Sequence, residues 1–212
     1  MFILGLTLVA VVSGAAQEEA VMKAEPFPLA SVRLLEGPFK DAMDRDCAYL
    51  LLLVPDRLLS WFSKEAGLEP KGEVYGGWET KGVAGHALGH YLSACSLAWG
   101  STGDEQFRER VAYIVDELAA CQAANGDGYV GAIPNGKAAF AALRRGELQV
   151  KPFELNGIWV PWYTEHKILA GLLDAHEHTG DKQALEVARR LADWTEEVTK
   201  GLSGEQFETI LA

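Results

Sequence analysis

The sequence lacks clusters of Lys or Arg, apolar runs long enough to cross a bilayer, and the common nucleotide-binding and nucleophile motifs. Its only adjacent basic pairs are Arg144-Arg145 and Arg189-Arg190, and the net charge of the 212 residues is −11. Binding of nucleic acid depends on clustered cations that neutralise phosphates, so we predict no nucleic-acid partner. The absence of a P-loop, a dinucleotide fingerprint and a G-x-S-x-G motif argues against nucleotide-dependent and serine-hydrolase chemistry.

Cysteine is scarce: Cys47, Cys95 and Cys121 are the only three, and their spacing is wide and irregular. No CxxC or Cys/His pattern is present, so the sequence predicts no metal site. Cys95 and Cys121 fall on apolar helical faces, where a free cysteine acts as a small hydrophobic side chain. With 49% apolar and 23% charged residues, the chain has the composition of one soluble globular domain.

Residues 1–16 have the pattern of a secretory signal peptide. The apolar run Phe2–Val12 is too short to span a bilayer, and the small residues at 13–16 suit cleavage by a signal peptidase. No Lys or Arg precedes the run, and a buried N-terminal helix is the alternative. We therefore expect a secreted or periplasmic protein with no membrane association after signal cleavage. Residues 17–37, with prolines at 26 and 28, predict an extended lead-in.

Two segments of the chain carry the same link between helices. Thr-Gly-Asp stands at 102–104 and again at 179–181, each time between stretches with apolar residues at helical spacing. Gly favours the left-handed conformation after a helix, and Asp caps the helix that follows. The repeat therefore predicts two αα-hairpins. Between them, the Gly- and Asn-rich loop 125–136 predicts a sharp bend, with Asp127 holding a turn.

Further helices are expected over 39–54, with an end or kink at Pro55, over 82–99 and near 137–146. Long aromatic-rich loops precede alternate helices, which favours a closed α/α toroid over an open solenoid of short uniform repeats. The predicted fold class is all-α, with αα-hairpins that form part of an (α/α)6 toroid. Because six hairpins complete such a toroid, we interpret 38–212 as the N-terminal half of a truncated barrel catalytic domain.

The stretch YGGWETKGVAGHALGHY, residues 75–91, supplies the first candidate site residues. His86 and His90 are four residues apart, so they share one face of the predicted helix. A zinc-protease motif has this spacing, but the glutamate that it needs as base is missing. Buried core histidines and polar contacts that line a pocket are the remaining alternatives. Trp78 and Glu79 precede the helix, and an aromatic ring beside a carboxylate suits the binding of a sugar.

A second entrance of the same kind precedes the later hairpin. Asn156, Trp159, Trp162 and Tyr163 come shortly before His166, which begins an otherwise apolar helix. A single His on such a helix is often structural, but its aromatic neighbours predict that His166 faces a pocket. The candidate substrate-binding residues are His166, Trp78, Glu79, His86, His90, Asn156, Trp159 and Tyr163.

Three motifs together resemble the β-L-arabinofuranosidase family, glycoside hydrolase family 127 and its close relatives. They are YGGWE…GHALGHYLSA, ANGDGYVGAIP and LNGIWVPWYTEHKILAGLLDA…TGD, and the similarity runs in order through residues 28–212. The resemblance implies an N-terminal (α/α)6 catalytic barrel, a carbohydrate substrate and the release of L-arabinofuranose from plant-type glycans. It also implies that His166, which matches a family histidine, contacts the sugar.

The resemblance implies a mechanism whose nucleophile, acid/base and zinc ligands are not recognised among these residues. In the family, a cysteine thiolate within a cysteine-and-glutamate zinc site is the nucleophile, and a glutamate is the acid/base. None of the three cysteines matches that cluster, so we assign no catalytic residue here and expect these groups, and the zinc, downstream of residue 212. The fragment alone is therefore expected to be inactive. Two alternatives stay open: another α/α-toroid carbohydrate enzyme, of the unsaturated glucuronyl hydrolase or polysaccharide lyase type, and a non-catalytic helical scaffold that binds protein or glycan.

Overall fold

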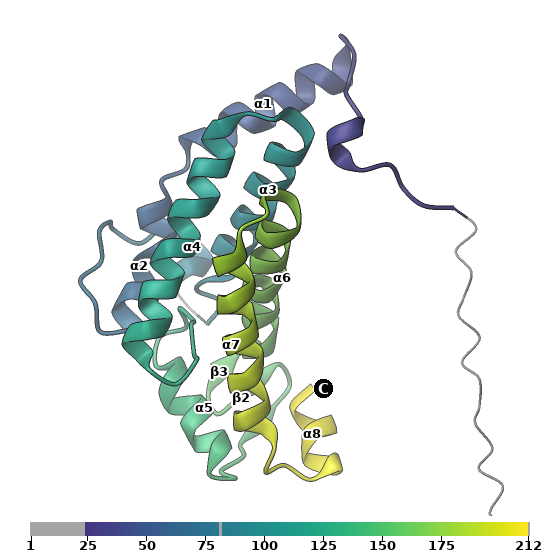
Figure 1. Ribbon diagram of the computed structural model, residues 1–212. Coiled ribbons are helices and arrows are strands. Elements are labelled where there is room, and N and C mark those ends of the chain that lie inside the picture. Colours follow the sequence, from purple (N-terminus) through teal and green to yellow (C-terminus); the bar gives the residue numbers. More distant parts are fainter. Residues whose placement is uncertain (1–23, 81, 212) are drawn as a thin grey trace, which may run out of the picture.

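The computed structural model describes residues 24–80 and 82–211, so the predicted signal peptide lies outside the described residues. The chain is mostly helical, as predicted. From residue 24 the lead-in is extended, with one short 3-10 turn, η1 (Leu29–Ser31), and it stands to one side of the helical body (Figure 1). None of the described helices is long and apolar enough to cross a membrane.

Proline and glycine set where several helices begin. The break predicted at Pro55 is confirmed, and the helix expected from residue 82 begins only at His86, because Gly82 and Gly85 adopt positive φ angles of 33° and 100°. The α-helices are α1 (Pro38–Leu52), α2 (Pro55–Glu65), α3 (His86–Thr102), α4 (Glu105–Asn125), α5 (Gly136–Arg144), α6 (Pro161–Thr179), α7 (Lys182–Thr199) and α8 (Gly204–Leu211).

Both Thr-Gly-Asp segments form the predicted links. The glycine of each has a φ above 70° and follows the last residue of its helix. The side chain of Asp104 accepts a hydrogen bond from Gln106 N at 3.0 Å, and that of Asp181 accepts one from Ala184 N at 3.0 Å. The αα-hairpins α3–α4 and α6–α7 are therefore confirmed.

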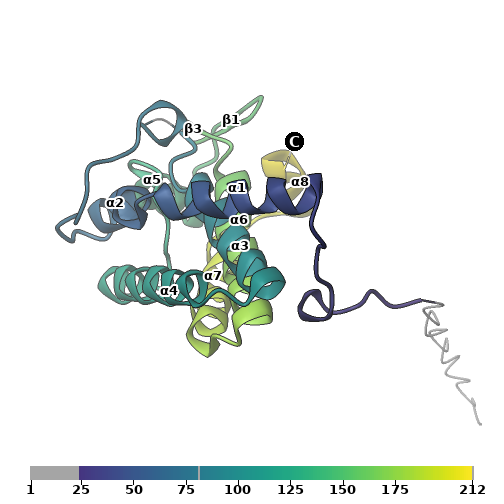
Figure 2. The same ribbon diagram turned by 90° about the horizontal axis from the view of Figure 1, so that it is seen from above.

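The two hairpins lie side by side, with α3 against α6 and α4 against α7 (Figures 1 and 2). Helices α3 and α6 are parallel, because His90 contacts Tyr163 near their N-termini and Gly100 lies near His178 at the other end. Their N-termini, and the long loops that precede them, consequently come to the same end of the molecule. The described residues form an open stack, and closure into a toroid stays a prediction.

The loop 125–136 between the hairpins is a core segment as well as a bend. The carboxylate of Asp127 accepts from Tyr129 N at 3.2 Å, which is the predicted turn. Beyond that turn the chain runs inward, and Tyr129, Val130 and Ala132 are fully buried. The Tyr129 ring packs on that of Trp194, with centroids 4.7 Å apart. The loop therefore joins α4 to α5 through the interior rather than over the surface.

A small antiparallel sheet that was not predicted lies ahead of α6. Its strands are β1 (Val150–Lys151), β2 (Glu154–Leu155) and β3 (Ile158–Trp159), in the order β1-β2-β3. Asn156 and Gly157 join β2 to β3 with φ angles of 49° and 81°. Paired positive angles at an Asn-Gly dipeptide are typical of a type I′ hairpin turn. This sheet carries Trp159 to the N-terminus of α6.

Candidate functional site

The loops that precede α3 and α6 meet at the common end of the two helices. Trp78, in the 3-10 turn η2 (Gly77–Thr80), lies edge-on to Trp159, with ring centroids 6.1 Å apart. A β-carbon on Gly82 would stand only 3.0 Å from that of Trp159, so the backbone before α3 runs directly against this residue. The two entrances, predicted separately, form one surface.

Imidazole and phenol rings continue this surface along the first turns of α3 and α6. The ring centroid of His86 lies 6.1 Å from those of Trp78, His90 and Tyr163. His90 Nε2 is 3.4 Å from Tyr163 Oη, a long hydrogen bond. We refer to Trp78, Trp159, His86, His90 and Tyr163 as the ring cluster.

Glu79 is buried beside the ring cluster and caps α3. Its Oε2 accepts from Gly85 N at 2.9 Å, and its Oε1 accepts from Ala87 N at 3.2 Å. The positive end of the helix dipole favours a carboxylate at this place. His86 Nδ1 is 3.0 Å from Glu79 Oε1 and 2.6 Å from Val83 O. Because both neighbours of Nδ1 are acceptors, that nitrogen carries a hydrogen, and Nε2 is left for a ligand.

The ring cluster is open to solvent. Trp78 is 66% exposed, Trp159 43% and Tyr163 42%. Burial, together with the neighbouring charges of Lys167 and His86, lowers the pKa of His90, so its ring is neutral at pH 7. A neutral imidazole donates at one nitrogen and accepts at the other. Open aromatic faces beside such groups suit an uncharged ring rich in hydroxyls.

Asn156 does not join the ring cluster. Its Nδ2 donates to Ala139 O at 3.0 Å and to Glu147 O at 3.1 Å, and its Oδ1 accepts from Gln149 N at 2.9 Å. The amide therefore holds the turn between β2 and β3 to α5 and to the segment that follows it. Contact of Asn156 with a sugar stays a prediction, and its hydrogen-bonding atoms are already engaged by backbone.

His166 and Trp162 lie on α6 next to Tyr163 but differ in environment. His166 is exposed and lies about one helical turn beyond Tyr163, and its contact with a sugar stays a prediction. Trp162 is half-buried and packs on Phe140, with ring centroids 5.1 Å apart. Of these two residues, only His166 extends the exposed surface of the cluster.

Sequence reasoning missed Glu165, which points into the core. It is 2% exposed, and neither carboxylate oxygen has a hydrogen-bond partner among the described residues. Burial raises the pKa of Glu165 well above its usual range. A signal was present: Glu165 shares the helical spacing of Ile168, Leu172 and Ala175, which are all buried.

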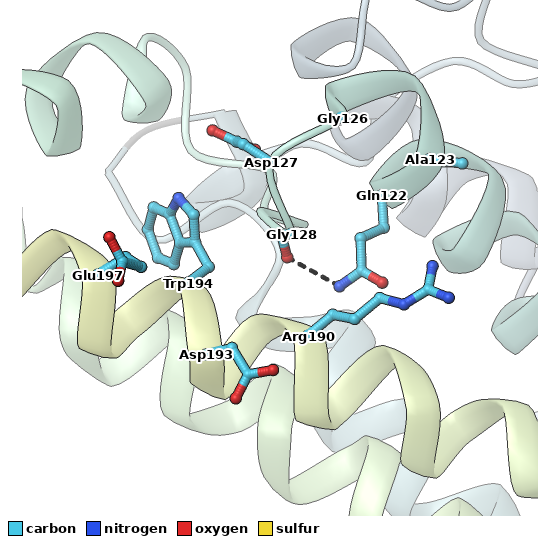
Figure 3. A pocket seen from close by; sticks show the side chains of 9 residues that line it. All are labelled: Gln122, Ala123, Gly126, Asp127, Gly128, Arg190, Asp193, Trp194 and Glu197. Carbon is cyan, nitrogen blue, oxygen red and sulfur yellow. Dashed lines mark hydrogen bonds between the residues drawn. The ribbon is translucent and has the colours of Figure 1, made fainter.

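A separate hollow of about 440 Å³ lies between the end of α4, residues 126–128 and α7 (Figure 3). The charged side chains of Asp127, Asp193, Glu197 and Arg190 line it. Trp194 also borders it, but this residue is only 4% exposed and offers no open ring face. The ring cluster is therefore the better candidate for binding an uncharged sugar.

Comparison with known proteins agrees with the motifs. A family model described as beta-L-arabinofuranosidase, GH127 catalytic domain, matches residues 31–212. The chain belongs to this family. The match includes both hairpins and every residue of the ring cluster. No curated protein matches the chain.

The zinc centre that the GH127 resemblance implies does not fit the described residues. Among them, only Asp174, Glu177 and His178 place three possible ligand atoms within 4.8 Å of one another, and this group contains no cysteine. Its residues lie roughly 17–22 Å along α6 from Tyr163. Burial is the main cause that raises the pKa of each cysteine thiol, to about 11 for Cys95 and Cys121. These residues therefore offer no place for a zinc site of cysteine thiolates and glutamate.

Proposed function

We propose that this chain is the sugar-binding part of an exported GH127 enzyme that releases L-arabinofuranose from plant-type glycans. The ring cluster carries the proposal, because it joins two hairpin entrances into one open aromatic surface that contains two imidazoles. Family membership supports a glycoside hydrolase with a carbohydrate substrate. The pattern of residues 1–16 supports export.

The proposed roles follow from position. Trp78 and Trp159 present ring faces to the apolar C–H face of the sugar. His86 Nε2, the neutral ring of His90 and the Tyr163 hydroxyl donate to and accept from sugar hydroxyls.

We place Glu79 behind His86 rather than against the sugar. Both carboxylate oxygens are engaged by the N-terminus of α3, and the residue is 7% exposed. Through Oε1 the carboxylate fixes the hydrogen on His86 Nδ1 and, with it, the orientation of the ring. Glu79 therefore positions the imidazole that meets the ligand.

The ring cluster binds and orients the sugar rather than cleaving it. Hydrolysis of a glycoside needs two reacting groups on either side of the bond. Glu79, which adjoins the cluster, is engaged in capping α3. We propose that the nucleophile, the acid/base and the zinc come from outside the described residues.

A uronic-acid substrate, as in the two alternative enzyme classes, fits the cluster less well. Its carboxylate would need a cation, and Lys167 is the cation that the described residues place nearby. The Lys167 ammonium already lies over the Tyr163 ring, 5.1 Å from its centroid. Membership of a beta-L-arabinofuranosidase family makes a neutral pentose the favoured ligand.

The test is a titration of the purified chain with methyl β-L-arabinofuranoside, followed by tryptophan fluorescence and calorimetry. We expect saturable binding, with affinity lowered tenfold or more in Trp78→Ala, which is about 1.4 kcal/mol. Tyr49→Ala is the matched control, because Tyr49 is 60% exposed on α1 and lies outside the cluster. Tighter binding of an unsaturated uronide would favour the glucuronyl hydrolase class. No binding of any glycoside by folded wild-type chain would contradict the proposed function.

Export has its own test. N-terminal sequencing of the protein recovered from the periplasm or medium of a bacterial host should begin near Ala16 or Gln17. An intact Met1 in those fractions would contradict signal cleavage.

A further inference from the structure

We propose that Glu165 and Tyr129 form a buried, hydrogen-bonded pair that holds residues 129–133 beneath the ring cluster. Glu165 is then a positioning residue for the site. None of the proposed sugar contacts involves these two side chains, and the evidence for the pair is their burial and geometry. Its effect on sugar binding rests on the proposed function.

Both side chains end in the same small space with no other partner. Glu165 is 2% exposed and Tyr129 is 0% exposed, and none of their side-chain oxygens has a partner within residues 24–80 and 82–211. A β-carbon at Gly131 would collide with Tyr129 Oη and stand 2.8 Å from Glu165 Oε1. The two oxygens are therefore at most about 5 Å apart, and because they make no direct hydrogen bond in this structure, one bridging water is the link that this separation allows.

The surroundings favour protonated forms of both groups. Burial is the cause that raises the pKa of Glu165. Burial also raises the pKa of Tyr129, followed by the negative charges of Glu165, Glu65 and Asp127. Glu65, at the end of α2, and Asp127, in the loop, are thus the other ionisable groups that face the pair. A neutral carboxyl and a phenol each have one hydrogen to donate and an oxygen to accept, so each satisfies the other.

The pair connects to the ring cluster through two contacts. Ala132 follows in the same loop, and its β-carbon would lie 2.8 Å from a β-carbon on Gly85. Gly85 N donates to Glu79 Oε2, and Glu79 in turn orients His86. Residues 129–133 are therefore packed between Glu165 on α6 and the N-terminus of α3, which Glu79 caps.

The direction of the pH dependence follows from the raised pKa of Glu165 in the folded chain. The stabilising effect of a protonated Glu165 is fully present below the pKa of the unfolded chain, about 4.3. It is lost as pH rises from there through the folded-state pKa, because the unfolded carboxyl releases its proton first. Glu165→Gln keeps a neutral hydrogen-bonding group at every pH. The melting temperature of this variant minus that of the wild type should therefore increase between pH 4 and pH 8.

Infrared spectroscopy tests the pair directly. At neutral pD the folded wild type should show the C=O band of a protonated carboxylic acid, and Glu165→Gln should lack it. Glu177→Gln, an exposed glutamate of the same helix, is the matched control and should keep the band. Tyr129→Phe should shift the band, because the carboxyl loses its partner. A wild-type spectrum without the band, or a band that Tyr129→Phe leaves unmoved, would overturn the pair.

Binding of methyl β-L-arabinofuranoside tests the positioning role. Glu165→Gln should keep the wild-type affinity within about twofold, whereas Glu165→Leu, which cannot hydrogen-bond, should lower it at least fivefold. If Glu165→Leu does not fold, Tyr129→Phe takes its place with the same expectation. Unchanged sugar affinity in folded Glu165→Leu or Tyr129→Phe would show that Glu165 does not position the site. If the wild type binds no sugar, the proposed function fails, while the infrared band still decides the pair.

Discussion

Gly89 on α3 touches the backbone of Lys167 on α6, so that a β-carbon at position 89 would collide with the Lys167 carbonyl. Gly171 makes the reciprocal approach, because its β-carbon would stand 2.6 Å from Gly89 O. Two helices that meet backbone to backbone bring their first turns into contact. This approach puts Tyr163 of α6 beside His86 and His90 of α3.

Gly89→Ala should destabilise the chain by about 2–3 kcal/mol, because the methyl group meets rigid backbone that cannot move aside. Urea unfolding measures the effect. Gly201→Ala is the control, since a β-carbon there would meet nothing within 4 Å. Equal urea midpoints for Gly89→Ala and the wild type would show that the helices do not approach this closely.

Glu79→Gln should cost about 1–2 kcal/mol of stability, because one capping oxygen becomes an amide that cannot accept. The same change should alter the NMR signals of His86, which loses its orienting partner. Glu73→Gln, at an exposed glutamate ahead of η2, should leave both the stability and these signals as they are. Unaltered His86 NMR signals in Glu79→Gln would show that the Glu79 carboxylate does not orient the His86 imidazole.

His90 should titrate below 6.5 in the folded chain, because burial and the charge of Lys167 disfavour its protonated form. The lowered pKa makes the stability of the fold depend on pH. Unfolded His90 binds a proton near pH 6.5, so the folded chain loses stability as pH falls from 6.5 through the folded-state pKa. An NMR titration of the His90 ring measures the midpoint. Lys167→Gln should raise it and Lys167→Arg should not, whereas a wild-type midpoint at or above 6.5 would refute the expectation.

His166→Ala should change the free energy of unfolding by no more than about 0.5 kcal/mol, since His166 is exposed. Binding of methyl β-L-arabinofuranoside should weaken by about 1 kcal/mol, as for the loss of one hydrogen bond. Both quantities are measured on one preparation, with His178→Ala at the far end of α6 as the binding control. Wild-type affinity in His166→Ala, or a large fall in stability, would support a structural role instead.

The 212-residue chain should not hydrolyse an aryl β-L-arabinofuranoside, with or without added zinc. The Cys95 and Cys121 thiols have a pKa of about 11 and are buried, so neither supplies a thiolate near pH 7. A thiol reagent at pH 8 should react with the partly buried Cys47 in the folded chain, and with Cys95 and Cys121 only after unfolding. Zinc-dependent turnover by the purified chain would show that the catalytic groups lie within it.

Part of the candidate site could be predicted because its signals are local or carried by recognisable motifs. Trp78, His86 and Tyr163 were selected from the two entrance motifs, and the structure brings all three together. Their role in binding sugar stays a prediction. The Asn156-Gly157 dipeptide is a strong hairpin signal, and the small sheet it forms could have been predicted from it. Glu165 also matched the apolar spacing of α6, yet its charge argued for the surface.

The sequence by itself determined the helix boundaries at Pro55 and at both Thr-Gly-Asp links, because a cap or a proline acts on backbone groups within about four residues. Only the tertiary structure decided that Trp78 meets Trp159, that the Glu79 oxygens are engaged in capping α3, and that Glu165 lies in the core. These relationships depend on the contact between α3 and α6, where segments far apart in the chain are brought together. No spacing pattern within either helix specifies which partner its glycines will meet.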